Sequence, residues 1–481
     1  MIFSSYEFIF IFLPLTFCLY FYLNKNKFTN LATGSLAFAS LFFYSWWNII
    51  YLPLILVSVT INYLASKLIL RSTLPKKVLL ILGVLFNLSL LGFFKYSDFF
   101  LQNINLVFDT NYSILNLILP LAISFFTFQQ IAFLADSYKG HVVKHTFLNY
   151  LVFVTFFPQL IAGPIVHHKE MMPQFTEKIN KSINYKNIYL GIFIFSIGLF
   201  KKAVIADTFS IWASNGFDLM DQLNLIEAWV TSLSYTFQLY FDFSGYTDMA
   251  MGAALLFNIK LPLNFNSPYK STNIRDFWKR WHITLSRFLR DYIYIPMGGN
   301  RKGSFKMYSN LFTTFLIGGL WHGAGWTFIF WGIMHAFAII THRIWATTGV
   351  KLNKIISWFL TFNFINLSWV FFRAEQWEDA IKIIKGMLGL SGVMLPTSLQ
   401  NISFLQQNKI VFGEVFANFN SDTEVILWIA IAFFVCLFFK NSNQVLIAYK
   451  PSSKIAFFIV TIFVISLMHL DKNVDFIYFN F

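Results

Sequence analysis

Charged residues are scarce in this chain of 481 residues: they make up 12% of it, whereas hydrophobic residues make up 57%. A water-soluble globule of this length needs more polar surface, so we predict a polytopic membrane protein. Cysteine is almost absent, because only Cys18 and Cys436 occur and each lies within an apolar run. A disulfide framework is therefore not expected, and we predict no metal site and no bound cofactor.

Acidic residues are the scarcer of the two charges, with 22 Asp and Glu against 36 Lys and Arg. In a soluble chain this surplus would suggest nucleic-acid binding, but here the basic residues cluster in short loops between apolar runs. The positive-inside rule describes that distribution, so we expect membrane lipids and no nucleic acid as partners. Lys25 and Lys27 directly follow the first apolar run and only Glu7 precedes it, which places the N-terminus outside the cytoplasm.

Apolar runs of helical length recur along the chain, and we read residues 1–481 as one all-α transmembrane domain. Breaks at Pro120 and Pro158 suggest re-entrant segments. Residues 391–424 are predicted to form an extracytoplasmic loop, and the aromatic tail 471–481 to end outside as well. The predicted spans are residues 8–23, 31–47, 49–70, 78–94, 114–135, 147–162, 188–212, 226–258, 307–320, 323–342, 355–372, 424–439 and 455–470.

The segment 260–306 is strongly basic, with ten Lys or Arg against two Asp, and is predicted to lie on the cytoplasmic face. Apolar residues recur at three- and four-residue spacing from 274 to 289, which predicts one amphipathic helix in the interface. Its Trp278 and Arg280 are candidates for supporting or lining a site, although simple anchoring to the headgroup layer explains them too. His282 is harder to explain as an anchor.

Two histidines lie where lipid-like sequence is expected, in residues 311–336. His322 stands in the run WHGAGW at 321–326 next to Trp321, and His335 follows inside the next apolar stretch. An ionisable group at membrane depth is a functional-site hypothesis by default. A neutral imidazole can act as a general base, whereas the alternative is a buried histidine that donates to a backbone carbonyl. The glycines around His322 would let another backbone or a substrate come close.

Depth separates two of the histidines. From residue 307 to residue 320 a helix rises about 21 Å at about 1.5 Å per residue, short of the roughly 30 Å hydrocarbon core. His322 is therefore expected inside the membrane, towards its outer half, and His282 nearer the cytoplasm. Two imidazoles at different depths suggest a path between the two faces.

Two carboxylates, Asp242 and Asp248, also fall inside an apolar span, and Gly245 between them is expected to interrupt that helix. They either hold broken backbone ends as a scaffold or take part in a reaction directly. The scaffold is the simpler interpretation.

Five blocks in order resemble the membrane-bound O-acyltransferase (MBOAT) family, and within it the bacterial polysaccharide O-acetyltransferases of the AlgI and PatA type. They are FPQLIAGPI at 157–165, DFSGYTDMA at 242–250, RDFWKRWHITLS at 275–286, DYIYIP at 291–296 and GLWHGA at 319–324. The resemblance implies a ring of about 11 to 13 transmembrane helices around a central tunnel. It also implies that His322 and His282 are catalytic, with His322 as the general base and His282 positioning or polarising the thioester, and that Tyr478 of the tail is an acyl relay.

The same resemblance implies an activity and its partners. An acetyl group from a cytoplasmic thioester, acetyl-CoA above all, would cross a bacterial inner membrane to O-acetylate an exported polysaccharide, either peptidoglycan or an alginate-like polymer. A periplasmic SGNH-type partner would complete the transfer. Two alternatives stay open: D-alanyl transfer to teichoic acid by a DltB-type enzyme, and a transporter or flippase that makes no bond, because intramembrane carboxylates and broken helices also suit transporters.

Overall fold

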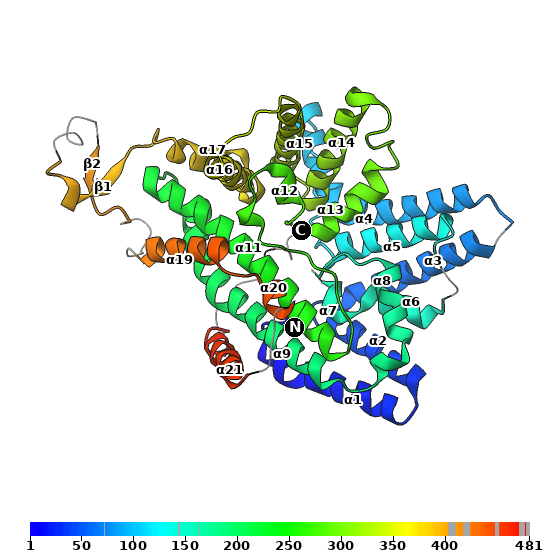
Figure 1. Ribbon diagram of the computed structural model, residues 1–481. Helices are drawn as coiled ribbons and strands as arrows, with labels where there is room; N and C mark the ends of the chain where they lie inside the picture. The colour runs from blue at the N-terminus through cyan, green and yellow to red at the C-terminus, as the bar shows by residue number, and fades with distance from the viewer. Residues whose placement is uncertain are drawn as a thin grey trace.

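A computed structural model describes residues 1–71, 73–142, 145–161, 163–402, 410–416, 424–447, 452–470 and 477. This part of the chain is helical almost throughout (Figure 1). Within it, six helices are long and apolar enough to cross a membrane: Glu7–Lys25, Ile49–Arg71, Lys76–Phe108, Tyr185–Leu219, Trp326–Thr347 and Lys354–Arg373. The predicted all-α, multi-pass membrane protein is confirmed, whereas the count of about 11 to 13 spans stays a prediction.

The helices of the first half follow one another with short connections. They are η1 (Glu7–Phe12), α1 (Leu13–Lys25), α2 (Thr29–Ser45), η2 (Ile49–Tyr51), α3 (Leu52–Arg71), α4 (Lys76–Phe108), α5 (Ile123–Tyr138), α6 (Phe147–Thr155), α7 (Phe157–Leu160), α8 (His168–Thr176), η3 (Lys178–Lys181), α9 (Tyr185–Phe200), η4 (Lys201–Ala206), α10 (Asp207–Ser214) and η5 (Asn215–Leu219).

The second half is helical as well and adds two short strands. Its elements are α11 (Leu225–Leu256), η6 (Pro268–Lys270), α12 (Ile274–Trp278), α13 (Ile283–Leu289), η7 (Arg290–Tyr294), α14 (Gly303–His322), α15 (Trp326–Thr347), α16 (Lys354–Arg373), α17 (Trp377–Met387), β1 (Met394–Pro396), η8 (Thr397–Leu399), β2 (Val411–Gly413), α19 (Glu424–Phe438), α20 (Ser442–Ile447) and α21 (Ser453–Leu467). Strands β1 and β2 pair in parallel at the edge of the molecule, within the predicted loop 391–424 (Figure 1).

Helix α11 lies at the centre of the bundle and packs against α9, α10, α16, α17 and α19 (Figure 1). Two glycine pairs bring the backbones of α9 and α11 into contact. A Cβ added to Gly198 would lie 2.5 Å from the carbonyl oxygen of Gly245, and one added to Gly252 would lie 2.6 Å from that of Gly191. Small residues allow this close approach between membrane helices. The expectation that Gly245 interrupts α11 is therefore wrong: the helix is continuous, and this glycine is a packing site.

The predicted amphipathic helix over 274–289 is also wrong. The structure has two short helices, α12 and α13, separated by a turn that contains His282. Hydrogen bonds to Asn264 interrupt the helix at this turn. The backbone carbonyl of Asn264 accepts from the Ile283 N–H at 3.0 Å, and its side chain accepts from Thr284. The apolar side chains that were predicted to lie in the membrane interface, such as Phe277 and Leu285, are buried in the core.

Two further expected spans differ in the structure. Helix α5 begins only at Ile123, so the first part of the predicted span 114–135 is not helical. The predicted span 147–162 divides into α6 and α7 just before Pro158, as a proline at the first turn of a new helix leads one to expect.

Candidate active site

Helix α14 ends at His322, and side chains of α4 hold that end in place. The last carbonyl groups of a helix lack intrahelical donors and need partners from elsewhere. Lys95 Nζ donates to the carbonyl oxygens of Trp321 at 2.6 Å and of His322 at 3.0 Å. The Tyr96 hydroxyl donates to the carbonyl oxygen of Leu320. Because a cation at a helix C-terminus also interacts favourably with the helix dipole, Lys95 fixes where α14 presents His322.

Glycines let α15 pack directly against the end of α14. A Cβ added to Gly319 would lie 2.5 Å from the carbonyl oxygen of Phe328 and 3.1 Å from the Cα of Gly332. A Cβ added to Gly323 would lie 2.1 Å from the ring of Phe328. The sequence left open whether the glycines near His322 admit a backbone or a substrate, and at these two positions they admit α15.

Aromatic rings surround the imidazole of His322, which is 2% exposed. Its centroid lies 4.9 Å from Trp321, 5.1 Å from Trp331 and 5.0 Å from Phe372. These rings come from the end of α14, from α15 and from α16. The surroundings are apolar and exclude bulk water, which strengthens any electrostatic interaction made inside them.

His282 occupies a strained position at the start of α13, with φ of 42°. Left-handed backbone is unfavourable for a residue with a side chain, and such strain is found preferentially at functional sites. Its Nδ1 lies 3.1 Å from Asn264 Oδ1, which also accepts from the N–H and the hydroxyl of Thr284. Because Asn264 Oδ1 is an acceptor, His282 Nδ1 donates to it. In the neutral ring the lone pair then belongs to Nε2.

One indole connects the two histidines. The Trp321 ring lies 4.9 Å from the His322 ring and 6.1 Å from the His282 ring. It is held by a hydrogen bond of 3.3 Å from its Nε1 to the carbonyl oxygen of Ser124 and by stacking on Phe128 at 5.3 Å. The structure thus brings His282 into one buried cluster with Trp321 and His322, which lie about 40 positions later in the sequence.

His335 lies next to this cluster, and both of its ring nitrogens are engaged. Trp278 Nε1 donates to His335 Nδ1 at 3.2 Å, so the proton of the neutral ring is on Nε2. That nitrogen lies 3.1 Å from the Ser368 hydroxyl, which donates onward to the carbonyl oxygen of Ile365. The neutral ring of His335 therefore has no nitrogen left to exchange a proton with a substrate.

The other predicted side chains lie elsewhere. Arg280 is one-third exposed and forms an ion pair with Asp276 at 3.0 Å. Asp242 and Asp248 are buried on α11, where they bind lysines of η4. Tyr478 lies outside the described residues.

Two residues of the cluster escaped the sequence analysis. Lys95 directly follows the predicted span 78–94, whereas α4 continues to Phe108 and so surrounds it with helix. A lysine between two apolar stretches of one long helix is the signal that marks it. Asn264 carried no signal, because a single asparagine in a loop reveals nothing about the histidine it contacts.

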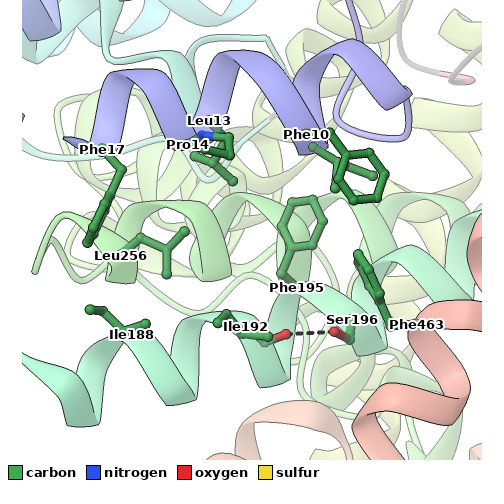
Figure 2. A pocket seen from close by; sticks show the side chains of 11 residues that line it. Phe10, Leu13, Pro14, Phe17, Ile188, Ile192, Phe195, Ser196, Leu256 and Phe463 are labelled. Carbon is green, nitrogen blue, oxygen red and sulfur yellow. Dashed lines mark hydrogen bonds between the residues drawn. The ribbon is translucent and has the colours of Figure 1, made fainter. Parts of the chain in front are cut away.

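No group of three or more His, Cys, Asp or Glu in the described part of the chain is arranged to hold a metal ion. The structure also has an apolar groove of about 400 Å³ between α1, α9 and α21 (Figure 2). Its walls include Phe10, Phe17, Phe195 and Phe463 and contain no histidine. The groove is thus separate from the histidine cluster.

Comparison with known proteins agrees with this architecture. The model of the MBOAT, membrane-bound O-acyltransferase family matches residues 136–372, which include the three clustered histidines. A peptidoglycan O-acetyltransferase of Helicobacter pylori is 54% identical over 428 residues, 82% of this chain and 81% of that protein. A probable alginate O-acetylase AlgI of Pseudomonas aeruginosa is 37% identical over 423 residues, 86% of this chain and 80% of that protein. A teichoic acid D-alanyltransferase of Bacillus subtilis is 30% identical over 251 residues, 50% of this chain and 62% of that protein.

The matched family model, the extent of the first two similarities and the helical membrane architecture agree with one another. The chain therefore belongs to the membrane-bound O-acyltransferase family and is an acyltransferase.

Proposed function

We propose that this protein O-acetylates peptidoglycan, passing an acetyl group across the bacterial inner membrane from a cytoplasmic thioester. The acceptor is inferred from the peptidoglycan O-acetyltransferase that is 54% identical over most of both chains. The alginate relative is 37% identical, and the teichoic acid D-alanyltransferase matches only half of this chain. The acyltransferase class leaves no role for a bond-free transporter, whereas D-alanyl transfer is the competing chemistry to test.

The arrangement that carries the proposal is the pair His322 and His282, whose rings both contact the ring of Trp321. His322 acts as the general base on the accepting hydroxyl: it takes the proton while the oxygen attacks the thioester carbonyl carbon. The carbon–sulfur bond then breaks, and the imidazolium returns the proton to the departing thiolate. A hydroxyl is a poor nucleophile without such a base. General base catalysis typically contributes about 10²- to 10⁴-fold.

His282 is assigned to positioning, with one change from the role suggested by the sequence. A neutral His282 whose Nδ1 donates to Asn264 offers a lone pair at Nε2, and a lone pair binds a donor and not a carbonyl oxygen. His282 therefore orients the accepting hydroxyl and does not polarise the thioester.

The donor is acetyl-CoA, which reaches the site from the basic segment 260–306 on the cytoplasmic face. The surplus of Lys and Arg in that segment supports this side, and the N-terminus and C-terminus then lie outside. Tyr478 of the C-terminal tail receives the acyl group as a relay, and a periplasmic SGNH-type partner completes transfer to the exported polysaccharide. Membrane lipids surround the exposed apolar surface.

The test measures base-labile acetate on purified peptidoglycan. The peptidoglycan comes from cells that produce either the wild-type protein or the variant His322→Gln. Glutamine keeps much of the size of the side chain but cannot accept a proton, so we expect acetate to fall by about 100-fold or more. His342→Ala is the matched control, because His342 lies on α15 away from the cluster. Protein content of the membranes and melting temperature in detergent are measured for each variant.

Three results would separate the possibilities. A wild-type level of acetate in His322→Gln cells rules out His322 as the general base. D-alanine esters that disappear in the same variant, with acetate unchanged, establish the D-alanyl reaction instead. If the variant lowers the acetate content of an exopolysaccharide and not that of peptidoglycan, the proposed chemistry holds but the acceptor is the exopolysaccharide.

A further inference from the structure

A buried ionic cluster stands at the centre of the bundle, apart from the three histidines. Asp242, in the middle of α11, is 1% exposed, and Lys202 of η4 is 3% exposed. Lys202 Nζ lies 3.1 Å from Asp242 Oδ1 and 2.6 Å from Asp207 Oδ1. Lys202 and Asp207 are five residues apart, the spacing that a π-helix such as η4 brings together.

The cluster combines two carboxylates with one ammonium group. Burying charge is costly unless each charge is paired and hydrogen bonded. A carboxylate has about four acceptor sites, and the ion pair with Lys202 leaves Asp242 with capacity for hydrogen-bond donors. Backbone N–H groups are suitable additional donors, since their hydrogen bonds to a charged acceptor are stronger than neutral ones.

The C-terminal segment supplies such a donor. The N–H of Ile477 donates to Asp242 Oδ2 at 3.1 Å, across 235 residues of sequence. The Ile477 side chain packs against the hydrophobic core. Ile477 directly precedes Tyr478 in the sequence, so the carboxylate of Asp242 holds the chain next to the residue proposed as the acyl relay.

A second carboxylate of α11, that of Asp248, binds α20, which precedes Ile477 in the sequence. Asp248 Oδ2 accepts from Lys201 Nζ and from the Ser442 hydroxyl of α20, both at 2.6 Å. Asn441 adds hydrogen bonds of 2.9 Å to Asn266 and to the hydroxyl of Ser267. The C-terminal part of the chain is thus attached to α11 at two carboxylates six residues, or about 9 Å of helix, apart.

We propose that Asp242 is a positioning residue, whose charge, balanced by Lys202, holds the chain at Ile477, within the C-terminal tail, against α11 through the backbone N–H of that residue. That this tail carries the acyl relay rests on the proposed function above. Recognition through the backbone places no demand on the side chain at position 477. It does require a residue with an N–H there.

Proline at position 477 tests the contact directly, because proline has no N–H. Ile477→Pro deletes the donor without touching the buried cluster, and Ile477→Ala is the matched control that keeps it. Asp242→Asn removes the charge of the acceptor with little change of shape. Each variant is made in full-length protein with Cys18 and Cys436 replaced by serine and a reporter cysteine introduced by Asn480→Cys.

The first readout is the rate at which a maleimide labels the reporter cysteine in membranes. Ile477→Pro and Asp242→Asn are each expected to raise the rate about tenfold, because the tail loses a charge-assisted hydrogen bond. Ile477→Ala keeps the N–H and loses only side-chain packing, which proline at this position loses in part as well, so it should raise the rate much less than Ile477→Pro. In the double variant the rate should rise no further than in either single variant, since both changes remove one interaction. An unchanged rate in Ile477→Pro, or two independent increases that multiply, overturns the proposal.

The second readout, acetate on peptidoglycan, separates this inference from the proposed function. Faster labelling together with reduced acetate supports both the anchor and the relay. Faster labelling with wild-type acetate supports the anchor and removes the relay through the tail. Unchanged labelling in Ile477→Pro overturns the anchor whatever the acetate level, and His322→Gln still tests the chemistry by itself.

Discussion

Lys95 donates a hydrogen bond of 3.0 Å from its Nζ to the carbonyl oxygen of His322, although the two residues are 227 positions apart. The same nitrogen donates to Trp321 and to the hydroxyl of Ser124. One cation thus joins α4, α5 and the last turn of α14. A lysine at membrane depth is costly unless it is paired, and two of the three acceptors that Lys95 binds are the carbonyl groups at the end of α14.

Replacing Lys95 by methionine should therefore displace His322. The chain length of the side chain is kept, but the carbonyl groups at the end of α14 lose their donor. We expect the free energy of unfolding to fall by about 1 to 3 kcal/mol, the cost of leaving buried acceptors unsatisfied. Acetylation should fall by about 100-fold, because small displacements of a catalytic group have effects of that size. Detergent melting curves and polymer acetate measure the two effects.

Lys76→Met is the control for this change, because Lys76 begins the same helix α4 and is exposed. It should leave stability and activity near the wild-type values. Equal losses in Lys76→Met and Lys95→Met would show that the effect belongs to the charge of the helix and not to the end of α14.

Asn264 sets the tautomer of His282, so its removal should resemble removal of the histidine itself. In Asn264→Ala the imidazole loses its Nδ1 acceptor and can protonate either nitrogen. We expect acetylation to fall by about 100-fold, within the range for loss of an acid–base partner. The double variant Asn264→Ala, His282→Ala should lose no more activity than His282→Ala, because residues that act as a unit are not additive. Multiplicative losses would contradict this coupling.

Gly323 is predicted to be intolerant of any side chain because of Phe328. The added Cβ of Gly323→Ala would lie 2.1 Å from the Phe328 ring, so α15 or the ring has to move. Overpacking of this kind destabilises by about 1 to 3 kcal/mol. Gly325→Ala is the matched control: its Cβ would meet the same ring at an ordinary 3.5 Å. Phe328→Leu should restore part of the stability lost in Gly323→Ala, and no recovery would exclude this clash as the cause.

The sequence predicted the class of fold and the cluster members His322, His282 and Trp321. It did not predict Lys95 or Asn264, for physical reasons. Composition determines that the chain lies in a membrane, and the cost of burying an imidazole identifies His322. Apolar spacing between 274 and 289 shows which residues are buried but not where the helix breaks. That break depends on Asn264, a tertiary contact that no local pattern contains. Gly245 was read as a helix breaker because the sequence does not reveal the facing Gly198.

His335 offers the sharpest contrast with His322, because both are fully enclosed histidines on neighbouring helices. The hydrogen bonds of His335 to Trp278 and Ser368 use both ring nitrogens, which indicates a structural role. Glutamine carries an amide donor and an acceptor, so His335→Gln should keep measurable acetylation, whereas acetylation in His322→Gln should fall by about 100-fold or more. Trp278→Phe removes the donor to Nδ1 together with part of the indole ring and should lower the free energy of unfolding by at least about 1 kcal/mol. The amount of acetate formed per folded molecule should stay close to wild type. Activity lost in Trp278→Phe without any loss of stability would instead place His335 in the reaction.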